Sequence, residues 1–376
     1  MIGYQNQFLM RANVNGIDDF VTGENLVKCT VRESVGLRPP TVDMVLKIKE
    51  ENLLSQLKEG QVIQMSMGKS TDDLKDFQFY VLFQNVTQID RQNYLIRLSG
   101  VTTDPNYFSE LSIEGKAPEL SIDRLKEVVS RRFTWHGGNT GASPDDEQIW
   151  LQTAMTDKDF LFKLWAHSFM EDNMFLPCIT RENEFIYKDL IQIVSSGPKT
   201  EANQNENSGG IHYDSDFSYT ARSGLINEWV GYEFAMLEYD MVEGKKEIPI
   251  QTPKSFISLT KQLEQRISQT QQFLGQRYKS RNCHEKYWLA YYKNLQTLAN
   301  MSANCLKFTY SKQLDDLRPL DMIMFKTTGI GPDTGSAEHL SGLYMIGATT
   351  REIMTQEVRT TLECYRETTN DFSAKM

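Results

Sequence analysis

The last part of this chain, residues 317–366, constrains the fold most strongly. Its final run places alternate residues on opposite faces of an extended chain, and the less polar face consists of Val358, Thr360, Leu362 and Cys364. A period of two residues is typical of a half-buried strand. Two more continuous apolar runs, at 323–325 and 343–348, come before it, and a Gly-rich loop lies between them. We therefore predict a small antiparallel sheet, curled into a barrel, at this end of the chain.

The first part of the chain, to about residue 111, has the same strand-like character. Apolar residues alternate with polar ones in four runs, at 42–48, 63–67, 77–83 and 94–98. Turn-forming residues separate these runs, and one short helix is expected at 51–58. Several short strands with regular turns are typical of a sandwich or barrel. This region therefore predicts a first β unit.

The period changes to that of a helix after residue 120. Residues 121–133 carry apolar side chains at helical spacing, with Ser121 as the expected N-cap. A second helix is predicted from Thr156, which could cap it, with Asp159 at the position of a capping-box acid. The runs 174–180 and 184–190 then suggest a short hairpin.

Three features follow in the second half of the chain. Residues 195–210 are polar and rich in Gly and Asn, which favours a mobile loop. Strand character returns at 217–249. Two helical patterns, at 254–278 and from Asn282 to Ser302, then predict a helical hairpin before strands resume at Cys305.

These elements predict a mainly β fold with α+β inserts, in which two tube-like antiparallel β-barrel domains accompany a helix-containing domain. The first barrel is expected to cover residues 1–112. The α+β domain is expected to combine 113–200 with 250–302, and the second barrel 211–249 with 303–376. Two strand-rich units of similar size at the two ends hint at structural duplication.

The composition excludes several classes of protein. The chain has 376 residues and a formal net charge of −10, whereas a general nucleic-acid binder needs a basic face. No apolar run approaches the length of a membrane helix, which is roughly 20 residues, and the N-terminus does not resemble a secretory signal. The five cysteines are scattered without a CxxC pair, so we expect free thiols in a reducing cytoplasm.

No grouping of residues predicts catalysis, a cofactor or a metal. His212 lies near Asp214 and Asp216 in "HYDSD", but such short polar clusters are common in loops. The adjacent Cys283 and His284 do not define a catalytic pair, because such pairs meet through the fold. "GKS" at 68–70 lacks the earlier glycine of a phosphate loop, and Gly329, Gly331 and Gly335 do not follow the strand–GxGxxG–helix order. The adjacent acids 145–146 and 315–316 are expected to be solvated. We therefore predict no catalytic, cofactor-binding or metal-binding residues and no enzymatic activity.

Three stretches in order along the chain carry a resemblance to a known family. They are "GQVIQMSMG" with "FYVLFQNVTQID" and "YLIRLSGV", then "TDKDFLFKLWAHSFMEDNMFLPCITRENEFIYKD", and finally "NCHEKYWLAYYKNLQTLANMSANCLKFTY" leading into "SGLYMIGATTREI" and "RTTLECYRE". The chain resembles the baseplate hub proteins of contractile-tailed bacteriophages and the hub half of the VgrG spike proteins of type VI secretion. The resemblance covers most of the chain, although its motifs are patterns of strand and turn.

The resemblance implies a structural virion protein of the tail baseplate, assembled in the host cytoplasm. It implies a homotrimer whose six barrels form a pseudo-sixfold ring, joining the sixfold tail tube to the threefold central spike. The implied partners are further copies of the chain, the tail tube or tape-measure protein, the central spike and the baseplate wedge proteins. DNA would pass through the lumen without specific binding, beside inward-facing acids, and no membrane or cofactor would be involved. Because residues 367–376 are too few for a needle, the spike is expected to be a separate protein.

Two other functions remain open at this point. The chain could be a tail-associated enzyme, such as a lysozyme or peptidase, or a monomeric receptor-binding β protein. A tail tube or terminator protein is a closer rival, but those proteins usually have one barrel. Turnover of peptidoglycan would indicate the enzyme, and a glycan-binding monomer would indicate the receptor-binding module.

Overall fold

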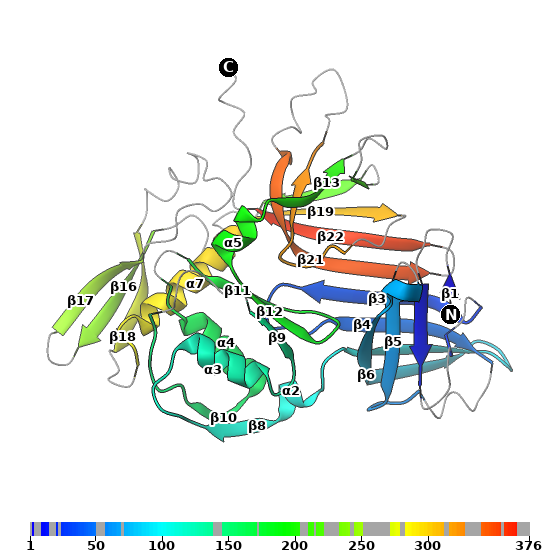
Figure 1. Cartoon of the computed structure of the whole chain (residues 1–376), viewed down its shortest axis with the longest axis horizontal. Helices are drawn as coiled ribbons and strands as arrows, with labels where there is room; N and C mark the ends of the chain where they lie inside the picture. The colour runs from blue at the N-terminus through cyan, green and yellow to red at the C-terminus, as the bar shows by residue number, and fades with distance from the viewer. Residues whose placement is uncertain are drawn as a thin grey trace, which may run out of the picture.

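The computed structural model describes residues 2–3, 9–14, 20–21, 24–49, 57–68, 71–137, 145–170, 173–203, 210–213, 216–221, 233–240, 244–250, 271–278, 283–311, 316–327, 340–354 and 357–366. Strands dominate these ranges, and the helices gather in the middle of the chain (Figure 1). None of the helices within these ranges is long and apolar enough to span a membrane.

The first β unit is built from seven strands in the order β1-β2-β5-β6-β7-β4-β3. Every neighbouring pair in this unit is antiparallel. The strands are β1 (Ile2–Gly3), β2 (Leu9–Asn13), β3 (Leu26–Ser34), β4 (Thr41–Ile48), β5 (Val62–Gly68), β6 (Lys75–Gln88) and β7 (Tyr94–Val101). A short 3-10 turn, η1 (Thr71–Asp73), joins β5 to β6.

The second β unit uses strands from both the middle and the end of the chain. They are β13 (Pro198–Asn203), β14 (Ile211–His212), β15 (Phe217–Ala221), β19 (Asn304–Ser311), β20 (Met322–Phe325), β21 (Gly342–Met354) and β22 (Val358–Arg366). β21 is central, because it pairs with β20, with β22 and also with β3 of the first unit. The two units therefore belong to one 14-stranded sheet.

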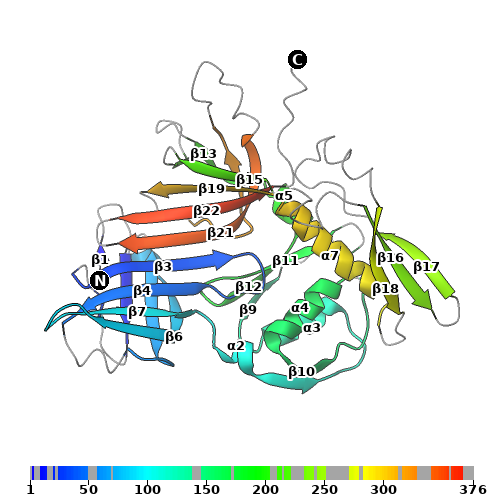
Figure 2. The ribbon, with the colours of Figure 1, turned by 180° about the vertical axis from the view of Figure 1, so that it is seen from behind.

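The helices and two small sheets form a middle unit beside this large sheet (Figures 1 and 2). Its helices are α2 (Asn106–Ser109), α3 (Ser121–Val129), α4 (Asp157–His167), α5 (Leu190–Ser195) and α7 (Tyr287–Met301). Its strands are β8 (Leu111–Glu114), β9 (Thr134–Gly137), β10 (Gln152–Thr156), β11 (Phe175–Ile179) and β12 (Glu184–Asp189). A separate sheet holds β16 (Glu233–Asp240), β17 (Gly244–Ile250) and β18 (Gln271–Tyr278).

Each of the three main units has its own hydrophobic core. The first β unit buries alternate residues such as Val42, Met44 and Leu46, all fully buried. The second buries Phe308 and Leu362 with other aromatic and aliphatic side chains. The core of the middle unit joins α3, α4, β11 and β12. The alternation seen in the sequence arises because each strand turns one face toward its core.

The structure confirms the predicted mainly β fold with two barrel units and a helix-containing unit. Thr156 caps α4 as expected, because its Oγ1 accepts a hydrogen bond from the Asp159 amide at 3.2 Å. The predicted hairpin forms between β11 and β12, and the consecutive strands β21 and β22 also pair antiparallel. The residue boundaries of the predicted domains stay a prediction.

Five local predictions were wrong. Residues 271–278 form β18 where a helix was expected, and the rest of that helix, 254–270, lies outside the described residues. β16 and β17 pair with β18 and not with the second β unit. β13 forms within the stretch predicted to be a mobile loop. Leu120, and not Ser121, is the N-cap of α3.

Asp146 is the fifth, since it is fully buried and not solvated. Its carboxylate accepts hydrogen bonds from the amide and hydroxyl of Ser121 and from the Phe169 amide. The pattern of apolar and polar residues within a short stretch gives no information about such distant partners. For this reason the sequence analysis wrongly expected Asp146 to be solvated. Part of the expected helix at 51–58 and the expected cap Asn282 lie outside the described residues.

α4 and α7 lie side by side and share a polar contact at the C-terminal end of α4 (Figures 1 and 2). The Asn294 side-chain amide donates to the carbonyls of Trp165, Ala166 and Ser168 at 3.2, 3.2 and 2.8 Å. Carbonyls at the C-terminal end of a helix lack the usual partners within it, and Asn294 supplies one, while the Ser168 amide also donates to the Trp165 carbonyl at 3.3 Å. His167 stacks on Tyr287 with ring centroids 3.6 Å apart. Tyr287 and its neighbours are therefore internal packing residues.

We expect the stability of this helix pair to depend on pH through His167. Burial lowers the pKa of His167 to about 4, whereas in an unfolded chain it is near 6.5. Between these values the unfolded chain binds the proton and the folded chain does not, so stability falls as the pH drops from 6.5 toward 4. The loss should reach about 3 kcal/mol.

Urea denaturation of the wild type and of His167→Asn, measured from pH 7 to pH 4, checks this. The variant should show a flatter dependence on pH. His136→Asn is the matched control, because His136 is half exposed, and it should leave the wild-type curve unchanged. Identical pH curves for wild type and His167→Asn would contradict the assignment.

Candidate assembly surface

The two β units are joined through their backbones by β3 and β21. These strands are antiparallel, with seven residue pairs in register from Ala348–Ser34 to Met354–Lys28. Ile353 of β21 is fully buried in the core of the first β unit. The outcome is one continuous row of strands, β6-β7-β4-β3-β21-β22-β19-β15, that crosses both units (Figure 1).

The two halves of this row have the same construction. The path β5-β6-β7-β4-β3 of the first unit matches β20-β21-β22-β19-β15 of the second. β6 and β21 are both long strands that pair with a short strand at one end and a longer one at the other. Each is interrupted by one bulge, between Val81 and Phe83 in β6 and between Ile346 and Ala348 in β21. Val81 and Ile346 therefore occupy equivalent positions.

A hydrogen-bonded turn confirms this equivalence. The Gly60 amide donates to the Val81 carbonyl at 2.8 Å, and the Leu320 amide donates to the Ile346 carbonyl at 2.9 Å. Gly60 and Leu320 also share a left-handed backbone, with φ of 79° and 76°. That conformation is uncommon for a residue other than glycine. The two β units are thus structural repeats despite having no visible repeat in sequence.

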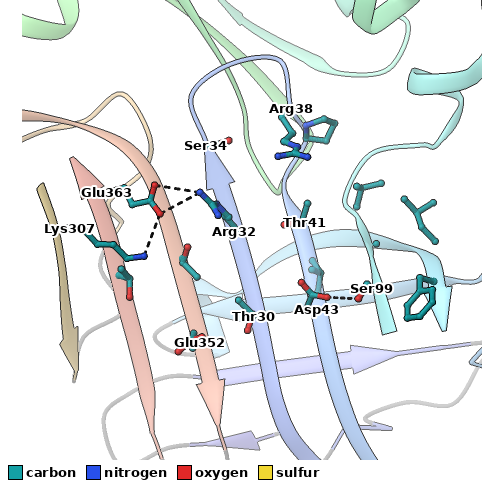
Figure 3. Close-up of a pocket in the computed structure, with 18 residues that line it drawn as sticks. Thr30, Arg32, Ser34, Arg38, Thr41, Asp43, Ser99, Lys307, Glu352 and Glu363 are labelled. Atoms are coloured by element: carbon teal, nitrogen blue, oxygen red, sulfur yellow. Dashed lines mark hydrogen bonds and ion pairs between the residues drawn. The ribbon is translucent and has the colours of Figure 1, made fainter. Parts of the chain in front are cut away.

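The solvent side of the β3–β21 joint forms a broad polar groove of about 730 Å³ (Figure 3). The charged residues that line it are three bases and three acids, namely Arg32, Arg38, Lys307, Asp43, Glu352 and Glu363. Leu82 and Phe83 of β6 also line it. The lining is therefore polar and balanced in charge.

Ion pairs cross the groove between the strands of the two units. Glu363 lies 3.4 Å from Arg32 and 3.8 Å from Lys307, and Lys28 lies 2.5 Å from Glu352 (Figure 3 shows the first two contacts). Arg32 and Lys28 come from β3, whereas Glu363 and Glu352 come from the second unit. Exposed pairs of this kind contribute little free energy, about 0–1 kcal/mol each, but they favour one register of the joint.

On the opposite side of the joint, a buried ionic cluster connects all three units. Glu33 of β3 contacts Arg351 of β21 at 2.9 Å and Arg181, which follows β11, at 3.4 Å. Glu33 and Arg351 are each only 1% exposed. Arg351 also donates to the Leu317 carbonyl at 2.5 Å, and the Arg181 amide donates to Glu33 at 3.1 Å. The charges of the two units and the middle unit therefore meet at one carboxylate.

Burial by itself would raise the pKa of Glu33, but the nearby Arg181 and Arg351 guanidiniums hold it below its ordinary value. The carboxylate therefore stays ionised at neutral pH. A buried charge is tolerated only when it is paired and hydrogen-bonded, and both oxygens of the Glu33 carboxylate accept hydrogen bonds from these arginines.

The residues singled out as possible chemical sites do not come together. His212 lies on β14, His284 hydrogen-bonds to the His167 carbonyl at 3.0 Å, and Gly68 ends β5. Asp214 and residues 328–339 lie outside the described residues. Within the described part of the chain, no group of three or more His, Cys, Asp or Glu residues could hold a metal.

Sequence reasoning missed the buried ionic cluster of Glu33, Arg181 and Arg351. One signal was present: Arg351 falls on the core-facing side of a strand, where an apolar residue is expected. A charged residue at such a position implies a buried partner. The partner itself could not be found from sequence, because Glu33 lies 318 residues away.

We expect Glu33→Gln to destabilise the protein by about 3 kcal/mol or more, because it leaves the buried Arg351 without its anion and removes one of the two carboxylates that contact Arg181. It should also remove the part of the acid sensitivity that Glu33 contributes. The pKa of Glu33 is lower in the folded chain than in the unfolded chain, where it is near 4.3. The stabilisation from its ionised carboxylate is therefore complete above about pH 4.3 and is lost as the pH falls through the pKa of the folded chain.

Urea and thermal denaturation measure both effects. Glu352→Gln is the matched control, since it removes an exposed pair at the same joint and should cost less than about 1 kcal/mol. Equal costs for the two variants would show that the buried cluster is not what holds the joint.

Comparison with protein-family models and with curated proteins finds no match to this sequence. Comparison with solved structures does. The chain is similar to the 43 kDa tail protein of prophage MuSo2 from Shewanella oneidensis, with a TM-score of 0.62, 10% identity, and coverage of 96% of this chain and 98% of the other. It is similar to a tail protein from Neisseria meningitidis MC58, with a TM-score of 0.61, 8% identity, and coverage of 96% and 97%.

A third similar structure is a component of the Escherichia coli type VI secretion system that shows structural similarity to bacteriophage T4 tail proteins. Its TM-score is 0.50 at 10% identity, with 94% of this chain and 76% of that one covered. At such low identity the likeness concerns the fold. The chain therefore has a fold shared with these phage tail proteins.

Proposed function

We propose that this protein is a structural component of a phage-type tail, the central hub of the baseplate. In this role three copies close into a ring of six similar β units, which joins the sixfold tail tube to the threefold central spike. The chain contributes walls and contacts, and it carries out no catalysis.

One observation carries this proposal. A single chain contains two equivalent β units that stand side by side and share a backbone joint. Repeating such a pair around a threefold axis produces six similar segments, which can face a sixfold tube on one side and a threefold spike on the other. A chain with one β unit would have no such means of matching the two symmetries. The fold shared with phage tail proteins supports the same role.

In this ring, the polar groove at the β3–β21 joint would face the lumen. Its three bases and three acids leave no net charge to attract a nucleic-acid backbone. DNA could then pass through without being held. This differs from the mainly acidic lining expected from the sequence, but balanced charge serves the same purpose.

The proposed partners are those of a tail hub: further copies of the chain, the tube or tape-measure protein, the central spike and the baseplate wedges. A chain of the Francisella PdpA–VgrG complex has a related fold, with a TM-score of 0.53 over 98% of this chain and 60% of that one. That likeness supports a spike protein as one neighbour. The proposed location is the baseplate of the virion tail, after assembly in the host cytoplasm.

Solution mass tests the ring. Light scattering should give three times the 43.3 kDa mass of the chain, and images of the purified protein should show a hollow ring with a sixfold-looking outline. A stable dimer, or a monomer at every concentration that can be reached, would count against the hub. Robust turnover of peptidoglycan or peptide would instead favour the enzyme considered above.

A charge reversal tests whether the groove faces the lumen. The double variant Glu352→Lys and Glu363→Lys changes its lining from three acids and three bases to one acid and five bases. The variant should retard DNA in a gel at low salt and lose that binding steeply as salt rises. The matched control, Arg32→Glu with Lys307→Glu, should bind no DNA. Similar DNA binding by both variants would contradict the assignment of this face.

A further inference from the structure

Among the described residues, the row from β6 to β15 has an unpaired stretch of strand edge at each of its two ends. In the second unit, the far half of β21 pairs on one side with β22 and on the other with β3. In the first unit, the equivalent half of β6 pairs with β7, and among the described residues its other edge beyond Val81 pairs with no strand. At the other end of the row, β15 pairs with β19 and, within the described ranges, with no second strand.

The strands that carry these two edges are equivalent to the two strands of the internal joint. β6 is the equivalent of β21, and β15 is the equivalent of β3. The edges lie at opposite ends of the strand row (Figures 1 and 2), so one chain cannot pair them with each other. Two copies placed end to end can. We propose that the free edge of β6 in one copy pairs antiparallel with β15 of a neighbouring copy, as β21 pairs with β3 within the chain.

The residue pairing of the proposed β6–β15 contact can be deduced from the pairing of β21 with β3. Glu352 pairs with Thr30 at the internal joint. Thr87 is the equivalent of Glu352, counted from the matching bulges of β6 and β21. Ser218 is the equivalent of Thr30, counted through β4 and β19. The proposed contact therefore pairs Thr87 with the neighbour's Ser218 and places Val86 opposite the neighbour's Tyr219.

The exposure of the two equivalent strand segments supports a missing partner at β6. Arg351, on β21, is 1% exposed because the first β unit covers it, whereas its equivalent on β6, Val86, is 44% exposed. Leu82, Phe83 and Ile89 on the same stretch are 47%, 49% and 54% exposed. A cluster of exposed apolar residues beside an unpaired strand edge is typical of an interaction site.

The sequence of these edges also suits pairing. Between Val81 and Ile89 there is no charged residue and no proline, and the same holds from Phe217 to Thr220. Proteins normally protect an edge strand that must stay unpaired with lysine, proline or another charge. The occupant of the β6 edge is therefore another copy of this chain. The core-facing side of β6 carries Gln84, Val86 and Gln88, so it is polar but uncharged, whereas the internal joint buries the Glu33–Arg351 pair. A partly polar contact is expected for chains that fold before they associate.

A disulfide tests this contact, which rests on the proposed ring. Thr87 and Ser218 are both exposed, so replacing them with cysteine should leave the fold intact. Residues that face each other across an antiparallel pair have Cα atoms about 4.5–5.5 Å apart, within the range that a disulfide needs. Under mild oxidation at a concentration where the protein is trimeric, Thr87→Cys with Ser218→Cys should run as a covalent trimer on a non-reducing gel.

The matched control moves one cysteine along β15 by two residues. Thr87→Cys with Thr220→Cys keeps both thiols on the same face but out of register, and it should cross-link at least about tenfold more slowly. Each single variant should give no covalent trimer. Equal cross-linking of the two double variants would overturn the register.

Amide hydrogen exchange on the unmodified protein provides an independent readout. Exchange at residues 84–88 and 217–220 should slow on going from dilute chains to the trimer, because edge amides become hydrogen-bonded. A trimer without the cross-link and without this protection would overturn the β6–β15 contact and leave the proposed hub standing. A protein that never forms a trimer would instead overturn the ring itself.

Discussion

The antiparallel pairing of β3 with β21 is the contact on which the rest of this structure depends. It turns two separate β units into one row of strands and sets their spacing and relative tilt. A backbone ladder is well suited to this task, since its register is fixed by the alternation of side chains on its two faces. A slip of one residue would move Glu33 and Ile353 from buried to exposed positions.

The two faces of this joint have different physical characters. The solvent face carries exposed ion pairs of balanced charge, which tolerate water and contribute little stability. The buried face holds Glu33 between Arg351 and Arg181, and loss of Glu33 would leave the charge of Arg351 unpaired in a region of low polarity. The contacts that align the three units are therefore mainly those on the buried side of the joint. The exposed face of the joint can therefore change without loss of the joint itself.

The structural repeat explains why a protein of this kind has no recognisable repeat in sequence. The shared features are a strand order, a bulge and a hydrogen-bonded turn, and none of them requires particular side chains. Even the left-handed turn position is glycine in one unit and Leu320 in the other. Similarity to tail proteins at 8–10% identity shows the same tolerance. Backbone geometry is retained while the residues that produce it diverge.

The sequence alone determined the mainly β character, the strands with a regular period of two, and helices such as α4, whose cap Thr156 is a local signal. The order of these patterns also indicated a fold shared with phage tail proteins. Only the tertiary structure decided that residues 271–278 form a strand, that Asp146 is buried, and which strands meet at the joint. The reason is that alternation and capping act between residues close in the chain, whereas Glu33 and Arg351, 318 residues apart, are brought together by the ladder itself.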